Sequence, residues 1–79
     1  MRKRPMFEKI RKMIGDYTDY PVDQITPQTE FLKDIKLNSF NTIALMGALE
    51  SELGVTVDQD EIKNIVTVGD LVDYIKSLL

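Results

Sequence analysis

The sequence predicts an all-α fold, in which three main helices and one short helix form a bundle with a long first loop. Apolar residues recur at helical spacing in three segments. Typical helix-capping residues precede the later segments, and no stretch alternates like a convincing strand. The 79 residues suffice for one domain, 1–79, in which we expect residues 1–4 to be frayed.

The first predicted helix covers residues 5–18. Pro5 suits its first position, and its apolar side chains share one stripe: Met6, Phe7, Ile10, Met13, Ile14 and Tyr17. The second predicted helix runs from Ser39 to Leu53, with Asn38 as N-cap and Gly54 as terminator.

Residues 20–38 are predicted to form a long connection, because Pro21 and Pro27 interrupt regular structure. Its apolar residues favour a loop packed on the helices: Val22, Ile25, Phe31, Leu32, Ile35 and Leu37. A short helix is predicted from Asp58 to about residue 64, and a last helix follows Thr67. The last helix has an apolar stripe of Val68, Leu71, Val72, Ile75 and Leu79.

Composition excludes several classes of function. Residues 1–12 hold six of the ten basic side chains and one acid, although the whole chain has net charge −3. The remainder is therefore acidic, which disfavours nucleic acid. No segment is long enough to span a membrane. The basic start lacks the apolar run of a signal peptide, so we expect a cytoplasmic protein.

An enzyme is not expected. The chain has neither histidine nor cysteine, so the common nucleophile–base pairs and metal sites are missing. Of its serines, Ser39 alone is at a helix start that follows a long loop. Backbone N–H groups at such a place favour a phosphate ester. Position alone leaves a plain capping serine as an adequate explanation.

The stretch from Ile25 to Ile75 carries a more specific signal. An acidic loop motif appears as Asp34-Ile35-Lys36, a serine triplet as Asn38-Ser39-Phe40, and downstream segments as "ALESELG" and "TVGDLVDYI". Together these segments resemble the acyl carrier protein family over nearly the whole chain. The resemblance implies an acyl-carrier-like four-helix bundle, with 4′-phosphopantetheine derived from coenzyme A attached covalently to Ser39.

The resemblance also implies partners. A phosphopantetheinyl transferase would attach the arm, and acyl-loading and synthase enzymes of fatty acid or polyketide type would use it. The carrier is expected to be a monomer that performs no chemistry itself. Aminoacyl or peptidyl carriage remains an alternative, as does an unmodified helical interaction module.

Three residues depart from the family pattern. Asn38 replaces the usual aspartate, which is expected to help bind the metal used by the transferase. Phe40 replaces the usual leucine, and Lys36 replaces the usual glycine. The first change predicts slower loading or a particular transferase.

Helix geometry assigns the faces of the second helix. At about 100° per residue, the predicted core face is Thr42, Leu45, Met46, Leu49 and Leu53. The opposite face is uncharged, and together with Asn38 it forms the predicted docking set: Asn38, Phe40, Ala44, Gly47, Ala48 and Ser51. A simple solvent face is the alternative. Candidates for lining an apolar acyl cavity are Ile43, Met46, Leu49, Ile62, Val66, Val68 and Leu71.

Overall fold

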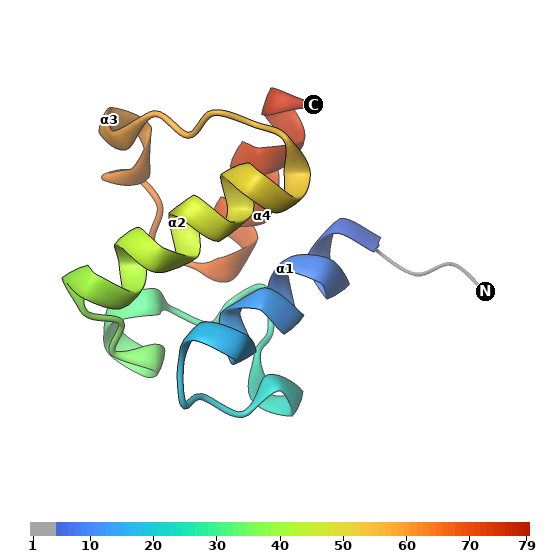
Figure 1. Cartoon of the computed structure of the whole chain (residues 1–79). Helices are drawn as coiled ribbons and strands as arrows, with labels where there is room; N and C mark the ends of the chain where they lie inside the picture. Colours follow the sequence, from blue (N-terminus) through green and yellow to red (C-terminus); the bar gives the residue numbers. More distant parts are fainter. Residues whose placement is uncertain (1–4) are drawn as a thin grey trace.

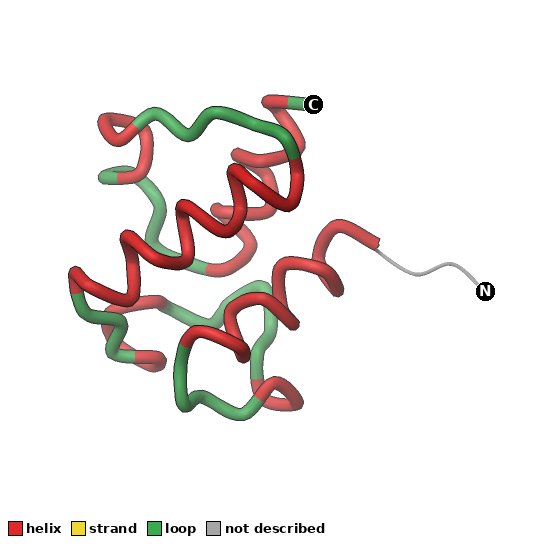
Figure 2. Tube along the Cα trace, in the orientation of Figure 1, coloured by secondary structure: helices red, strands yellow, loops and turns green. Residues whose placement is uncertain are grey.

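The computed structural model describes residues 5–79, and the predicted fraying of residues 1–4 lies outside the described residues. In chain order the elements are α1 (Pro5–Tyr17), η1 (Val22–Gln24), η2 (Phe31–Ile35), α2 (Ser39–Leu53), α3 (Gln59–Ile62) and α4 (Val68–Leu78). In Figure 1, α2 crosses the middle of the molecule with α1 on one side and α3 on the other. Figure 2 shows helices joined by loops, with no strand in the described part. The all-α prediction is confirmed.

Helix α1 packs its apolar stripe against α2 and α4. Ile10 and Ile14 are fully buried, and Phe7 and Met13 are nearly so. The stripe was predicted to end with Tyr17, but that side chain is exposed at the last turn of the helix. Burial of this stripe removes apolar area from water, which is the main favourable contribution to a fold of this size.

Helix α2 begins and ends where the sequence predicts. The side chain of Asn38 accepts a hydrogen bond from the backbone N–H of Asn41 at 2.7 Å. At the other end Gly54 adopts a left-handed conformation with φ 67°, and its N–H donates to the carbonyl of Glu50. A glycine adopts this conformation without the steric penalty that a Cβ brings. None of the helices within residues 5–79 combines the length and the apolar character that crossing a bilayer requires.

The connection from α1 to α2 is packed, as predicted, and contains two short helical turns. Ile25, Phe31 and Leu37 are buried, and Ile35 is half-buried. Leu32 was predicted to pack as well, but it is exposed, because η2 turns its neighbour Phe31 inward instead.

Backbone hydrogen bonds hold this connection against the start of α4. Phe31 donates to the carbonyl of Val66 at 3.0 Å, and Val68 donates to the carbonyl of Thr29 at 2.9 Å. A Cβ on Gly69 would lie 2.9 Å from the Pro27 carbonyl oxygen, so this close approach requires glycine. The loop before Ser39 is thereby fixed to a distant part of the chain.

The short helix is shorter than predicted, and α4 has the predicted cap. Asp58 caps α3 by accepting from the N–H of Asp60. Thr67 and Asp70 form a capping box, in which each side chain accepts from the backbone N–H of the other. Hydrogen bonds from the Thr67 and Val66 amides lower the pKa of the Asp70 carboxyl below its ordinary value of 3.8.

Candidate functional site

Ser39 is the first residue of α2, and its side chain is exposed. Asn38 occupies the N-cap position: its side chain accepts from Asn41, and its carbonyl accepts from the N–H and the hydroxyl of Thr42. The first N–H groups of an α-helix have no intrahelical acceptor. Those of Ser39 and Phe40 are therefore close to the serine hydroxyl at the positive end of the helix dipole.

The chain turns sharply just before this serine. Lys36 adopts a left-handed conformation with φ 60° and ψ 45°, and within residues 5–79 it is the one non-glycine residue with positive φ. Its N–H and that of Leu37 both donate to the carbonyl of Phe31. Leu37 is buried, whereas Asn38 and Ser39 are exposed. The turn thus anchors the chain one residue before it emerges at the surface.

Asp34, the acid of the loop motif, supports the preceding turn. Its carboxylate accepts from the N–H of Glu30 at 2.9 Å, and Glu30 is the N-cap residue of η2. A carboxylate at the start of a helical turn satisfies an N–H that would otherwise lack an acceptor. In this structure, then, the motif around Asp34 shapes the loop that presents Ser39.

The predicted docking set is divided by the structure. Asn38, Phe40, Gly47 and Ser51 are exposed, but Ala44 and Ala48 are half-buried. Ala48 lines a hollow with Met13 and Tyr17 of α1. Ala48 therefore does not face freely outward as predicted, because α1 lies beside it.

The predicted core face of α2 is also narrower than expected. Leu45 and Leu49 are fully buried, whereas Thr42, Met46 and Leu53 are only half-buried. Thr42 and Met46 line surface hollows toward α3. The buried side of α2 is therefore centred on Leu45 and Leu49.

The predicted cavity-lining residues occupy three different environments. Leu49, Val68 and Leu71 are fully buried in the core, and Met46 and Ile62 are half-buried. Ile43 is 71% exposed and Val66 is 52% exposed, so neither is enclosed inside the bundle, although Ile43 lines the open hollow between α2 and α3.

Both corrections have geometric reasons. Ile43 and Leu45 are two residues apart and therefore point about 200° apart around the helix axis. Because Leu45 faces the core, Ile43 faces outward. Val66 lies in the extended segment before α4, where successive side chains point to opposite sides. Its neighbour Ile65 is the half-buried one.

Two hollows lie between α2 and α3. One has a volume of about 370 Å³ and is lined by Thr42, Ile43, Met46, Gly47, Glu50, Val57, Gln59 and Ile62. The other, of about 230 Å³, is lined by Phe31, Leu32, Leu37, Thr42, Met46, Ile62, Lys63 and Ile65. Thr42, Met46 and Ile62 belong to both linings. A mostly apolar groove thus runs along α2 beneath α3.

Two residues that sequence reasoning did not identify hold the link between α2 and α3. Glu50 Oε2 accepts from the N–H of Val57, and the hydroxyl oxygen of Tyr74 accepts from the N–H of Asp58, both at 2.8 Å. No sequence signal marks these contacts, because they join residues of α2 and α4 to a link without regular structure. They set the position of α3 above the groove.

The chain is similar to known proteins over most of its length. Residues 8–75 match the family model described as "Phosphopantetheine attachment site". The acyl carrier protein of Helicobacter pylori (strain G27) is 37% identical over 71 residues, which cover 90% of this chain and 91% of that protein. The acyl carrier protein of Lactobacillus acidophilus is 38% identical over 77 residues, 98% of this chain and 96% of that one.

A solved structure agrees with these relatives. The acyl carrier protein of Enterococcus faecalis, which is described as having high thermal stability, has a TM-score of 0.81 and 30% sequence identity. The match covers 100% of both chains.

Proposed function

This chain belongs to the acyl carrier protein family, and on that premise we propose that it carries acyl groups on a 4′-phosphopantetheine arm attached to Ser39. The observation that supports the attachment point most directly is the position of Ser39. It is an exposed serine at the first turn of α2, held there by the Asn38 cap and the buried Leu37.

The residues around Ser39 fit a phosphate ester. The serine side chain is open to solvent, and the first turn of α2 contains no acidic residue that would repel the phosphate. Its unpaired backbone N–H groups and the helix dipole favour negative charge. Lys36, also exposed, is three residues earlier. When attached, the arm supplies the thiol that this chain lacks, and the thiol holds acyl groups as thioesters.

The protein's own contribution is to position the attachment point and to provide surfaces. The turn at Lys36 and the cap at Asn38 fix the start of α2. The groove between α2 and α3 is the structure's candidate for contact with an acyl chain, because half-buried Met46 and Ile62 line it. Methionine adapts its shape to variable apolar neighbours. We assign no catalytic residue to the chain.

The cargo is proposed as a class of acyl group rather than as a single compound. The uncharged outer face of α2 favours a specialised pathway, of polyketide type, over bulk fatty acid synthesis. Incubation of the armed protein with acyl transferases and, separately, with adenylating enzymes would distinguish acyl cargo from aminoacyl cargo. Loading by adenylating enzymes alone would replace the acyl proposal with an aminoacyl or peptidyl carrier.

Intact mass spectrometry tests the attachment site. We expect the protein to gain the mass of one phosphopantetheine after incubation with coenzyme A and a broad-specificity phosphopantetheinyl transferase. Ser39→Ala should abolish the gain. Ser51→Ala is the matched control, because Ser51 is also an exposed serine on α2, and it should still be modified.

Two outcomes contradict the proposal. The absence of any mass gain in the wild-type chain would leave Ser39 as a structural residue of an interaction module. A gain that persists in Ser39→Ala would place the arm elsewhere.

A further inference from the structure

We propose that Glu50 limits the length of the acyl chain that the groove between α2 and α3 accommodates. Its carboxylate closes the end of the groove that lies away from Ser39, and an apolar chain stops there. The inference rests on the proposed function, because it assumes that an arm on Ser39 delivers an acyl group to this groove.

Ser39 and Glu50 lie on the same side of α2. Together with Ile43 and Met46 they are spaced at i, i+4, i+7 and i+11, so all four fall within about 60° around the helix axis. The rise of an α-helix puts Glu50 about 16 Å beyond Ser39. A chain that enters the groove beside Ser39 and follows α2 therefore reaches Glu50.

The two hollows give this groove a direction. The hollow of about 230 Å³ includes Leu37, which lies just before Asn38 and Ser39 in the chain. The hollow of about 370 Å³ shares Met46 with it and continues to Glu50 and Val57. The groove therefore starts near the serine and extends along α2 to Glu50.

A hydrogen bond bridges the groove at Glu50. The chain leaves α2 at Gly54 and runs back to α3 (Figure 1). Glu50 Oε2 accepts from the N–H of Val57 at 2.8 Å, and Val57 is buried. The hydroxyl oxygen of Tyr74 accepts from the next amide, that of Asp58, also at 2.8 Å. Side chains of α2 and α4 thus hold the same short segment, which closes the groove at this end.

Glu50 brings a charge to this closed end. Among the described residues that line the hollow of about 370 Å³, Glu50 is the one with a charged side chain. Within residues 5–79, the N–H of Val57 is the one protein donor to its carboxylate. A carboxylate accepts up to about four hydrogen bonds, so its other acceptor sites need water. Replacing that water by methylene groups costs more free energy than burial of those groups returns.

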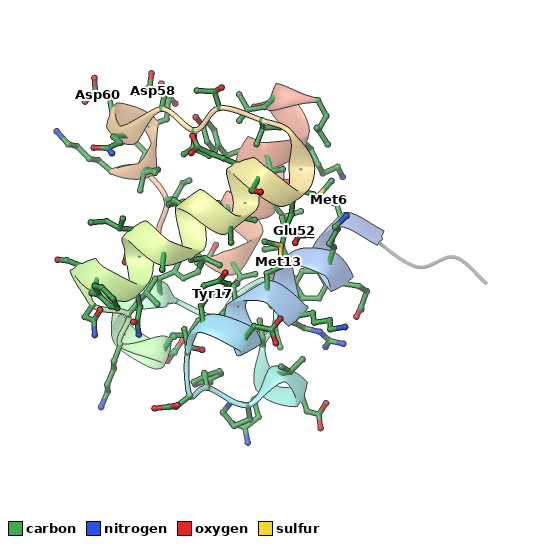
Figure 3. The ribbon with its side chains drawn as sticks, in the orientation of Figure 1. Met6, Met13, Tyr17, Glu52, Asp58 and Asp60 are labelled. Carbon is green, nitrogen blue, oxygen red and sulfur yellow. The ribbon has the colours of Figure 1, made fainter. Side chains whose placement is uncertain are left out.

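The other acid of α2 lies outside the groove. Glu52 is exposed and lines the hollow toward α1 together with Lys9 and Lys12. Figure 3 shows it on that side, near Met13. Because Glu52 is two residues from Glu50, the two side chains point about 200° apart around the helix axis. Glu52 is therefore a matched control, with the same chemistry on the same helix.

The stability of acyl-armed proteins tests the proposal. A broad-specificity transferase and acyl derivatives of coenzyme A, from butanoyl to hexadecanoyl, give a series of carriers that differ only in chain length. Urea unfolding measures the folding equilibrium constant of each carrier, relative to the same protein with an unacylated arm. Every CH₂ group that enters the groove should raise this constant by up to about fourfold. In the wild-type protein the rise should stop at one chain length.

Glu50→Gln should move this stopping length to longer chains. The amide oxygen still accepts from the N–H of Val57, and burial of a neutral amide costs less than burial of a carboxylate. With a chain two carbons beyond the wild-type limit, the gain in the variant should exceed the wild-type gain about tenfold. Glu52→Gln should stop at the wild-type length. The length itself depends on where the arm places the thioester, so the prediction concerns the difference between variants.

Tyr74→Phe separates the charge of Glu50 from the rigidity of the link. It removes the acceptor of the Asp58 N–H and keeps the aromatic ring. The unacylated variant should be less stable than the unacylated wild type, and its stopping length should be unchanged. A longer stopping length in Tyr74→Phe would assign the limit to the rigidity of the link, against the proposal.

The remaining contrary outcomes are distinct. A rise that continues through hexadecanoyl in the wild-type protein, or the same stopping length in Glu50→Gln, would overturn the limit set by Glu50. Absence of any stabilisation by an acyl chain would also overturn it, while the mass gain still supported the arm on Ser39. Failure of the wild-type chain to gain mass would instead overturn the proposed function.

Discussion

Replacing Lys36 by glycine should stabilise the fold. Lys36 is exposed and adopts φ 60° and ψ 45° at the turn between η2 and α2. Within residues 5–79 its ammonium group makes no ion pair. Removing the side chain therefore loses no described contact and relieves the close approach of Cβ to the backbone.

The size of the effect follows from two opposing contributions. The left-handed conformation costs an L-residue about 1–2 kcal/mol, and glycine loses about 0.5–1 kcal/mol through the larger entropy of its unfolded chain. The difference is about 0.5–1 kcal/mol in favour of Lys36→Gly. For a domain of this size, that corresponds to a rise in Tm of about 2–8 °C.

Thermal unfolding followed by circular dichroism measures this change directly. Lys33→Gly is the matched control, because Lys33 is also an exposed lysine but belongs to the helical turn η2 without positive φ. Glycine there should lower the stability by about 1 kcal/mol. If Lys36→Gly lowered Tm or left it unchanged, the left-handed backbone at this turn would not be the source of strain that we infer.

Two further predictions concern helix starts. Asn38→Asp keeps an acceptor for the Asn41 N–H and adds negative charge at the start of α2, so thermal unfolding should show about 0.3–1 kcal/mol of stabilisation. The transferase should also attach the arm faster to this variant. Slower attachment would contradict the role that the resemblance implies for this carboxylate. Asp70 has a lowered pKa, so its stabilising contribution is present above its ordinary value of 3.8 and is lost as pH falls through the folded-state value. Urea unfolding should therefore show Asp70→Asn to be less stable than wild type near neutral pH. The difference in free energy of unfolding between the two proteins should become smaller in acid, and a difference that does not change with pH would refute this.

Much of the fold could be predicted because its signals are local. The Asn38 cap, the Gly54 terminator and the Thr67–Asp70 capping box each involve atoms within a few residues of one another. Such contacts depend on the order of residues alone. For the same reason, the order of residues is enough to place Ser39 at the start of α2.

The faces of α2 were harder to predict because a helix can rotate about its own axis without any change in its sequence pattern. Its residues from 42 to 49 are nearly all apolar or small, so no strong stripe defines an inner side. The structure buries Leu45 and Leu49, covers part of Ala48 with α1 and leaves Ile43 exposed. Only the positions of neighbouring helices make that choice.

By itself, the sequence determined the helical class, the boundaries of α2, the position of Ser39 at its first residue and the resemblance to carriers. The tertiary structure decided which side of α2 remains open, and it directed Glu50 to the α2–α3 link and Glu52 toward α1. The physical reason is the sequence separation of the interacting residues. The hydrogen bonds of caps and turns form within one or two helical turns, whereas the exposure of a side chain depends on segments far away in the chain.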